Sequence, residues 1–575
     1  METAQSLKIQ TELAQRTQGN PAQRHKRLYR LVCDGGWLRA GLEAVLANRG
    51  SRTPGVDGVT KRHIEGQAGG REELVQQLHH ELLTETYHPQ PVKRVYIPKA
   101  NGQWRPLGIA TLRDRAVQAT VKMVLEPIYE SIFHPFSWGF RPLRSTHHAL
   151  SAVRRGAADP KHGYKWIIEG DITACFDEID QRLLRRFLKK RIQDPRLLDL
   201  ITRMLRCGIW EEGQTSYPQR GVVQGSVVSP LLTNVFLHEF DDWFVRTYRM
   251  RPEWAHLAPG SLSARRKKDL GGTLMVTRYA DDWVAVWNGS RTRAEEIKAE
   301  IQTFLARELK LTLSEEKTHI THIDEGVDFL GYRLQGDKRW ADGQWCLFSR
   351  VPPRAIKRLR EAVKGITHNT FTDEVAAFTA LAGLIRGWGN YYAYAADSRL
   401  MDSLDAFIYQ EVWKYCLQKC EGRAKRAYHQ YTLPRPLRQA GTFQLGLVVG
   451  EQIVRLPRLN GIPRKALTLG YPAPAYLEVQ RHPLPYTGIT DEQWWERHVW
   501  GGQEGSRIGQ HRLAAEILAR DPVCQLCQEQ PATQVHHEPP WQDRPVHDPA
   551  TAMGVCSSCH GQTRRSVGKS NGELR

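Results

Sequence analysis

Hydrophobic residues recur along the first two thirds of the chain with two different spacings, and each spacing predicts a different kind of element. A spacing near 3.6 residues predicts a helix, whereas alternation or a short apolar run predicts a strand. Helices are predicted in this way at residues 23–48, 71–87, 114–133, 180–206, 229–248 and 295–309. Strands are predicted at residues 92–98, 104–109, 164–172, 274–279, 283–287 and 328–334. Residues 1–25 are polar, and we expect them to be frayed.

Strands and helices interleave between residues 90 and 335 around a central hairpin, which predicts an α+β domain. Residues 352–420 have a helical pattern, residues 425–515 are rich in Pro, Arg and Trp, and residues 520–575 gather Cys and His. The length of 575 residues suits roughly three to five domains. We expect a multidomain α+β protein with divisions at residues 1–90, 91–335, 350–425, 426–515 and 516–575.

The net charge of the chain indicates which kind of molecule it binds. The formal net charge is +19 and the pI is near 9.5, an excess that usually matches a polyanionic partner, with nucleic acid as the first candidate. No window approaches about 18 uninterrupted apolar residues, so neither a membrane span nor a membrane partner is expected. The polar N-terminus lacks the apolar core of a signal peptide. We therefore expect a protein of the bacterial cytoplasm or of an organelle.

Three aspartates stand where strands are predicted to end. Asp171 follows an apolar run, and Asp281 and Asp282 lie at the tip of an apolar hairpin. Transfer of a nucleotide from a triphosphate is catalysed by two divalent ions held close together, and hard ions such as Mg²⁺ prefer carboxylate oxygens. A carboxylate at a strand end beside carboxylates at a hairpin tip suits that chemistry. A bare Asp-Asp pair is also an ordinary turn sequence.

The string from Arg278 to Asp282, Arg-Tyr-Ala-Asp-Asp, resembles the reverse transcriptase box of the group II intron family. Further blocks occur in the order of that family: Val95–Ile109 with Asp114, Arg115 and Gln118, Ser137–Pro142, Gly170–Asp177, Gly221–Leu232, Ser314–Thr318 and Phe329–Tyr332. The resemblance covers roughly residues 25–335. It implies a right-hand polymerase with fingers and palm, followed by a helical thumb or maturase domain.

The resemblance also implies roles for single residues. Asp171 and Asp281 would bind two Mg²⁺ ions with help from the Ile172 carbonyl, and Asp282 would complete the catalytic box. This set makes the first part of the expected site.

The nucleotide pocket follows from the same resemblance. Lys99 and Arg105 of the fingers hairpin would grip the triphosphate. Phe176 would place its ring against the sugar and so select deoxynucleotides, although a ring there also suits core packing. The pair Gln224-Gly225 would let the backbone approach the incoming base, because glycine permits close approach. Lys317 would approach the phosphates, or it is a solvated surface lysine.

Residues 350–425 resemble the thumb or maturase domain of intron-encoded proteins, which bind intron RNA and aid its splicing. Gly387 to Tyr392 reads Gly-Trp-Gly-Asn-Tyr-Tyr, and helices with basic and aromatic faces suit RNA. The alternative is a plain thumb that grips template and primer without splicing activity. Residues 426–515 are expected to form a DNA-binding or linker region.

The last residues contain two Cys-x-x-Cys pairs separated by 28 residues, Cys524/Cys527 and Cys556/Cys559, a spacing typical of a structural zinc site with four thiolates. The segment resembles a small ββα-type HNH endonuclease module. In that family, residues at the positions of His536 and His560 hold one catalytic divalent ion, and a residue at the position of His537 is the general base. Thr551 stands where the family has Asn, which leaves open a zinc-stabilised module that binds DNA without cutting.

These features together predict a group II intron-encoded RNA-directed DNA polymerase. Such a protein would also act as a maturase and would nick target DNA for intron mobility (retrohoming). Its partners would be intron RNA, target DNA, a template–primer duplex and deoxynucleoside triphosphates. Two alternatives remain open: an RNA-binding splicing factor without polymerase activity, and a free-standing reverse transcriptase of another lineage.

Overall fold

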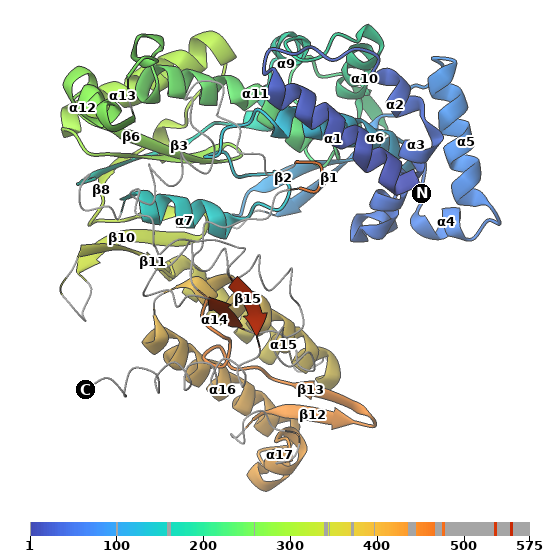
Figure 1. Ribbon diagram of the computed structural model, residues 1–575. Coiled ribbons are helices and arrows are strands. Elements are labelled where there is room, and N and C mark those ends of the chain that lie inside the picture. Colours follow the sequence, from blue (N-terminus) through green and yellow to red (C-terminus); the bar gives the residue numbers. More distant parts are fainter. Residues whose placement is uncertain are drawn as a thin grey trace, which may run out of the picture. The chain divides into compact units, whose positions relative to one another are not determined.

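A computed structural model provides the coordinates, in which the chain forms two compact units, Met1–Asp491 and Glu492–Arg575 (Figure 1). The structure describes residues 2–98, 102–157, 163–257, 259–338, 343, 345–369, 373–395, 397–434, 437, 444–465, 474–477, 534–537 and 552–555.

A four-stranded antiparallel sheet in the order β6-β7-β3-β8 forms the centre of the first unit. Its strands are β3 (Trp166–Asp171), β6 (Leu274–Tyr279), β7 (Asp282–Trp287) and β8 (Ile320–His322). Helices α11 (Ser229–Phe244), α12 (Pro259–Leu270) and α13 (Arg291–Phe304) lie on one side of this sheet, and α7 (Thr146–Ala157) lies on the other (Figure 1). The predicted strands at 164–172, 274–279 and 283–287 are thereby confirmed.

Alternation along the strands divides the interior into two hydrophobic cores. Ile168, Trp283 and Ala285 belong to the core shared with the helices α11 and α13. Val284 and Val286, which alternate with those residues on β7, belong to a second core on the opposite face. A sheet covered on both faces has to be apolar on both, which explains the continuous apolar runs of these strands.

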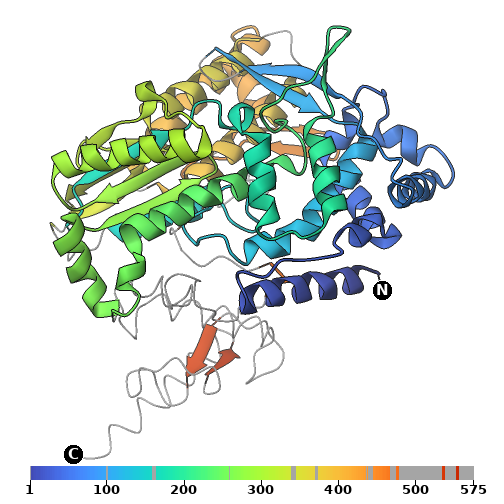
Figure 2. The same ribbon diagram turned by 90° about the horizontal axis from the view of Figure 1, so that it is seen from above.

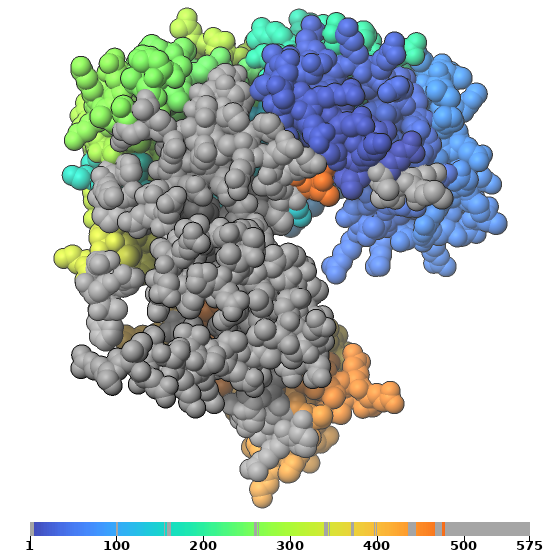
Figure 3. Space-filling model, in the orientation of Figure 1, coloured from blue at the N-terminus to red at the C-terminus, as the bar shows by residue number. Residues whose placement is uncertain are grey.

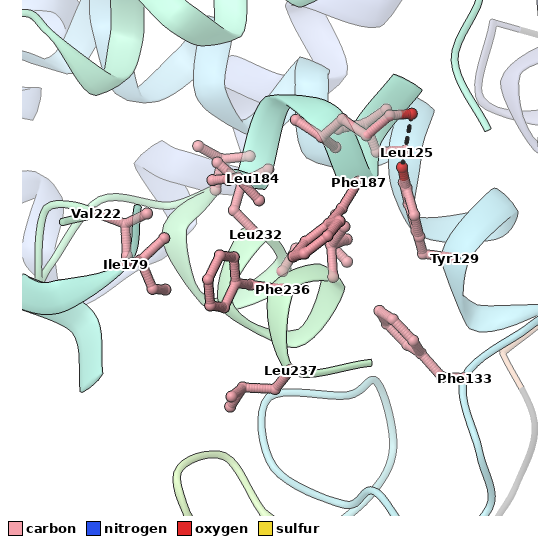
Figure 4. Close-up of a cluster of buried hydrophobic side chains, with 14 of the residues drawn as sticks. Leu125, Tyr129, Phe133, Ile179, Leu184, Phe187, Val222, Leu232, Phe236 and Leu237 are labelled. Atoms are coloured by element: carbon pink, nitrogen blue, oxygen red, sulfur yellow. Dashed lines mark hydrogen bonds between the residues drawn. The ribbon is translucent and has the colours of Figure 1, made fainter. Parts of the chain in front are cut away.

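The large aromatic side chains of the first core come from several helices (Figure 4). Phe187 of α9 (Gln181–Lys189) packs against Phe236 of α11 with ring centroids 5.3 Å apart. Tyr129 of α6 (Leu112–Glu130) donates a hydrogen bond of 3.4 Å from its hydroxyl to the Leu188 carbonyl. Helix α6 is thereby joined to α9, which packs against α11.

A second four-stranded sheet, in the order β2-β1-β4-β5, belongs to the fingers. Its strands are β1 (Val92–Pro98), β2 (Trp104–Ile109), β4 (Ile209–Glu211) and β5 (Gln214–Ser216). Helices α2 (Tyr29–Cys33), α3 (Gly35–Ala47), α4 (Lys61–Glu65) and α5 (Gly70–Leu83) pack against one another, and α2, α3 and α5 also contact α6. The hairpin predicted at residues 92–109 is confirmed, and Ile97 pairs with Arg105 across it.

Residues 1–25 were expected to be frayed, and this expectation is wrong, because α1 spans Glu2–Gly19. Leu13, Ala14 and Thr17 are buried, and the Gln10 side chain donates a hydrogen bond of 2.8 Å to the Met123 carbonyl of α6. The helix lies along the outside of the fingers helices (Figures 1 and 2), and the N-terminal residues form a continuous part of the surface (Figure 3). A narrow stripe of small residues is enough to dock it.

Three other predicted elements are each divided in two. The helix predicted at residues 23–48 forms α2 and α3, which are separated by the extended Asp34. Residues 180–206 form α9 and α10 (Pro195–Leu205) instead of one helix. Pro195 starts α10, and the Asp194 carboxylate accepts a hydrogen bond from the Leu197 amide. Residues 328–334 form β9 (Val327–Phe329) and β10 (Tyr332–Lys338), because Leu330 and Gly331 adopt positive φ and reverse the chain.

The helical pattern predicted at residues 352–420 is confirmed. The helices are α14 (Pro353–Thr367), α15 (Glu374–Tyr391), α16 (Ser398–Lys419) and α17 (Ala424–Tyr431). Strand β11 (Trp345–Arg350) precedes them and pairs with β10, and the hairpin of β12 (Gly446–Val449) and β13 (Gln452–Arg455) follows them. Among the described helices, none has the length and apolarity needed to cross a membrane.

The second unit is described at one antiparallel hairpin, β14 (Gln534–His537) with β15 (Ala552–Val555). His536 pairs with Met553 and His537 pairs with Ala552. The expected ligands Cys524, Cys527, Cys556, Cys559 and His560, and Thr551, lie outside the described residues.

Candidate active site

Strand pairing brings the three predicted carboxylates together. Asp171, the last residue of β3, lies directly opposite Asp282, the first residue of β7. Asp282 also pairs with Tyr279 of β6, so Ala280 and Asp281 alone form the turn between β6 and β7. Ala280 takes a left-handed conformation with φ of +59°, which is uncommon for a residue other than glycine. All three aspartates are half-buried at one end of the sheet.

Burial and like charge disfavour ionisation of this cluster. Burial, followed by the charges of Asp171 and Asp281, raises the pKa of Asp282 to about 7. Burial and the charge of Asp171 also raise the pKa of Asp281, while the nearby Arg105 charge opposes that shift. Glu169, two residues before Asp171 on β3, has its pKa raised chiefly by burial. The site thus concentrates negative charge that cations can relieve.

Lys317 is the cation in direct contact with the cluster. Its Nζ lies 2.7 Å from Asp171 Oδ2, and this hydrogen bond raises the pKa of the lysine. The side chain of Lys317 is 66% exposed and that of Asp171 is 29% exposed, so solvent screens the pair. The structure therefore places Lys317 at the carboxylates.

The backbone beside Asp171 has a defined orientation. The Ser314 amide donates to the Asp171 carbonyl and the Thr173 amide donates to the Thr312 carbonyl, both at 2.9 Å. Ile172 therefore faces Leu313 as a non-hydrogen-bonded pair, in which the amide and carbonyl of each residue point away from the partner. The Ile172 carbonyl points to the side of β3 on which β7 and its turn lie.

Two predicted pocket residues lie on the loops beside β3. Phe176 lies on the short helix α8 (Cys175–Glu178), and its ring stands edge-on to the ring of Phe140 with centroids 5.9 Å apart. Gln224 donates a hydrogen bond of 3.1 Å to the Asp177 carboxylate, and its carbonyl accepts one of 2.7 Å from the Gly108 amide. These contacts connect the Gln224 loop to α8 and to the fingers strand β2.

Gly225 has φ of +103°, and a Cβ there would lie 2.7 Å from the Gly108 carbonyl oxygen. Both constraints favour glycine at this position, next to strand β2. Arg105 is exposed on β2 and its charge acts on Asp281. Lys99 lies outside the described residues.

Sequence reasoning missed the polar scaffold beneath the turn. Arg278, the residue before Tyr279, is fully buried and donates a hydrogen bond of 2.8 Å to the Ala280 carbonyl. Its other partners are the side chains of Ser137, Asn234 and Asp241. The signal was a charged residue within an apolar strand, together with Asn234 and Asp241, two polar residues seven apart on a mostly buried helix.

The aromatic string at the end of α15 fastens the thumb to the palm. The Tyr391 hydroxyl donates to the Leu330 carbonyl at 2.7 Å, and the Tyr392 hydroxyl donates to the Gly331 carbonyl at 3.0 Å. The Tyr332 hydroxyl donates in return to the Tyr391 carbonyl. Tyr391 also raises the pKa of Tyr279, whose shift is due mainly to burial. These tyrosines thus hold the turn between β9 and β10, near Tyr279 of the hairpin formed by β6 and β7.

Comparison with known proteins places two domains on the chain. The family profile "Reverse transcriptase (RNA-dependent DNA polymerase)" matches residues 97–334. The profile "Group II intron, maturase-specific domain" matches residues 356–432. A reverse transcriptase domain followed by this maturase domain is the arrangement of a polymerase that acts in intron splicing.

Several curated proteins are similar to the chain. Protein YkfC of Escherichia coli is 38% identical over 367 residues, which are 62% of this chain and 95% of that protein. Group II intron-encoded protein LtrA of Lactococcus lactis is 32% identical over 370 residues, 57% of this chain and 60% of LtrA. Nuclear intron maturase 2 of Arabidopsis thaliana is 26% identical over 283 residues, 39% of this chain and 37% of that protein.

Proposed function

The chain belongs to the family of reverse transcriptases that carry a group II intron maturase domain, and from this premise we propose that it copies RNA into DNA at the carboxylate cluster of Asp171, Asp281 and Asp282. Among the observations, the strand register gives the strongest support for placing the reaction at these carboxylates. The strand register sets Asp171 against Asp282, beside the turn that carries Asp281.

The donor set suits two Mg²⁺ ions. Burial, together with the charges of neighbouring carboxylates, raises the pKa values of Asp281 and Asp282, and a hard divalent cation relieves both effects. Carboxylate and carbonyl oxygens are the preferred ligands of such a cation. Asp171 and Asp281 would hold the ions, with the Ile172 carbonyl as a further ligand and Asp282 in support. When bound, the ions stabilise the charge that develops on the attacking and leaving oxygens.

The incoming deoxynucleoside triphosphate would lie between the fingers hairpin and the palm. Arg105 and Lys99 would bind its phosphates, since a guanidinium gives two-pronged contact with phosphate oxygens. Lys317 would exchange its contact with Asp171 for a phosphate. The Gln224-Gly225 backbone would line the base, and the Phe176 ring would exclude a 2′-hydroxyl.

Primer extension tests the polymerase proposal directly. A DNA primer on an RNA template is incubated with deoxynucleotides and Mg²⁺, and the wild-type chain is compared with Asp281→Asn. The matched control is Asp199→Asn, on an exposed carboxylate of α10. The proposal predicts extension by the wild type and the control and none by Asp281→Asn. Equal extension by Asp281→Asn would disprove the catalytic assignment.

Sugar selection is a separate test. Phe176→Ala removes the ring that Phe140 supports edge-on, so ribonucleotides should be incorporated at least about 10-fold more efficiently relative to deoxynucleotides. The kcat/KM for deoxynucleotides is the internal reference. An unchanged ratio would leave Phe176 as a packing residue.

The maturase domain suggests that intron RNA is the natural partner. Splicing of that RNA at moderate salt should be faster with the protein than without it, and Asp281→Asn should accelerate splicing as the wild type does. If splicing is accelerated but no primer is extended by the wild type, the chain is an RNA-binding splicing factor without polymerase activity. If primers are extended without any effect on splicing, a free-standing reverse transcriptase is the better description.

The second unit favours one additional function, nicking of target DNA for intron mobility. Its support is the spacing of the four cysteines, together with a hairpin whose strand β14 carries His536 and His537. A four-thiolate zinc site would hold the module together, and His536 and His560 would hold one divalent ion. Duplex target DNA with Mg²⁺ or Mn²⁺ should be nicked by the wild type and not by His537→Ala. Bound zinc without nicking would indicate a DNA-binding module, in line with Thr551.

A further inference from the structure

Arg278 is a buried guanidinium whose donors are all used. Its Nε and Nη2 bind the two carboxylate oxygens of Asp241 at 2.8 and 2.5 Å. Nη2 also donates to Ser137 Oγ at 2.8 Å, and Nη1 donates to Asn234 Oδ1 at 3.2 Å and to the Ala280 carbonyl at 2.8 Å. A guanidinium has five N–H donors, so these five bonds satisfy it completely.

Stability alone does not explain this arrangement. Arg278 is 0% exposed and Asp241 is 1% exposed, and removing two charges from water offsets most of what their attraction contributes. A pair of apolar side chains would fill the same space at lower cost. What the apolar pair could not do is donate a hydrogen bond to the Ala280 carbonyl.

That carbonyl belongs to the peptide that joins Ala280 to Asp281. Because the peptide is planar, the orientation of this carbonyl fixes the positions of the Asp281 amide nitrogen and Cα, and it thereby constrains where the Asp281 side chain leaves the turn. The other side of Ala280 is closed by Gly139, where a Cβ would lie 2.3 Å from the Ala280 amide nitrogen. Asn234 links the two sides, since it donates to the Gly139 carbonyl at 2.8 Å and accepts from Arg278.

We propose that Arg278 is a positioning residue for polymerisation, which holds the Ala280–Asp281 peptide so that the Asp281 carboxylate is preorganised for its metal ion. This inference rests on the proposed polymerase function. Asp241 neutralises the guanidinium and fixes its plane, and Asn234 and Gly139 keep the left-handed Ala280 in place. Neither Arg278 nor Asp241 has to touch a substrate to act in this way.

The test separates positioning from folding. The double variant Arg278→Met/Asp241→Leu removes both buried charges, so it should fold with a Tm near that of the wild type, yet it cannot bind the Ala280 carbonyl. Arg278→Lys is the second variant, because an ammonium can pair with Asp241 but cannot supply the planar fork. The control is Arg113→Met/Glu81→Leu, which removes another ion pair, in the fingers.

The readouts are the Mg²⁺ concentration at half-maximal extension, kcat, and Mn²⁺ binding measured by electron paramagnetic resonance in the template–primer complex. For both Arg278 variants we expect about 10-fold higher half-saturating Mg²⁺, about 100-fold lower kcat and weaker Mn²⁺ binding, while the KM for template–primer is unchanged. The control should match the wild type in all four quantities. Wild-type metal dependence in either folded Arg278 variant would overturn the proposal.

Mn²⁺ binding keeps this test independent of turnover. If the wild type binds Mn²⁺ in an Asp281-dependent manner but extends no primer, the polymerase proposal fails while the positioning role is still measured. If the double variant does not fold, Arg278→Lys decides by the same readouts. If Mn²⁺ binding is equal in wild type and Arg278→Lys, the inference is wrong.

Discussion

Replacing Gly170 by alanine should distort the catalytic strand. Gly170 precedes Asp171 on β3 and lies directly opposite Trp283 of β7, whose indole covers it. A Cβ at residue 170 would lie 2.1 Å from Cζ2 and 2.3 Å from Cε2 of that ring. Trp283 is fully buried and packs against Phe240 with ring centroids 5.8 Å apart, so the ring has little room to withdraw.

The magnitude follows from this overlap. Inserting a methyl group into a packed core costs about 1–3 kcal/mol. For a unit that spans Met1–Asp491, with an unfolding entropy of roughly 2 cal/mol/K per residue, a loss of about 2 kcal/mol lowers Tm by roughly 2 °C. Activity should fall further than stability suggests, because a shift of about 1 Å at a catalytic group can cost about 100-fold in rate. The assays are thermal unfolding and single-turnover primer extension.

A double-mutant cycle identifies the cause. Trp283→Phe shortens the ring and leaves a cavity, which is destabilising by less than the roughly 3–5 kcal/mol of a tryptophan-to-alanine change. The shorter ring also leaves space for a methyl group at residue 170. Gly170→Ala should therefore cost less in the Trp283→Phe background, by a coupling energy of about 1–2 kcal/mol. Gly365→Ala is the control, since nothing lies within 4 Å of a Cβ at that position of α14, and it should stabilise the helix by about 0.5–1 kcal/mol. Wild-type Tm and rate in Gly170→Ala would refute the reasoning.

Three other predictions concern the fingers, the thumb and the nucleotide loop. Burial lowers the pKa of His25 from 6.5 to about 4, so the folded chain binds this proton less readily than the unfolded chain. The free energy of unfolding should therefore fall as the pH is lowered from 6.5 towards 4, by about 2 kcal/mol at pH 5. Urea unfolding across that range should lose this slope in His25→Leu and keep it when the exposed His80 is changed to Gln. Tyr392→Phe removes the hydrogen bond to the Gly331 carbonyl, which contributes about 1 kcal/mol. The cDNA made in the presence of a heparin trap should be shorter, while the rate of first-nucleotide addition stays unchanged. Equal product length would contradict the link between thumb and turn. Gly221→Ala would put a Cβ 2.8 Å from the Asp177 carbonyl oxygen at a residue with φ of +86°. This variant should raise the KM for deoxynucleotides several-fold and lower Tm, and an unaltered KM would show that this loop does not shape the pocket.

Local patterns of apolar residues predicted the central strands of the fold. Apolar runs predicted β3, β6 and β7 and the tight turn between the last two. Both Asp281 and Asp282 were expected at the tip of that turn, whereas Asp282 is the first residue of β7 and pairs with Tyr279. The pairing of Asp171 with Asp282 could not be read from these runs, because strand register depends on contacts between segments more than 100 residues apart in the sequence. The resemblance to the family motifs implied that Asp171 and Asp281 act together, which the apolar runs alone did not.

Other features were not predicted from the sequence, and each has a physical reason. Helix α1 packs against α6 and α3 through a few buried residues, among them Leu13, Ala14 and Thr17, and its polar majority concealed them. The reversal at Leu330 and Gly331 was concealed by a continuous apolar string, since one left-handed leucine leaves no composition signal. Arg278 was visible as a charge within a strand, but its partners Ser137, Asn234 and Asp241 come from distant segments.

The catalytic sheet forms the wall between two hydrophobic cores, and this has a consequence for how the protein can be divided. The face of β7 that carries Val284 and Val286 is covered by residues of the second core, which continues into α14 and α15 through Leu359 and Phe378. A fragment that ended after Tyr332 would keep α7 on this face but would lose the part of the second core that α14 and α15 contribute. We therefore expect the thumb to tolerate changes of sequence better than its removal, because its removal would open the core on which the sheet rests.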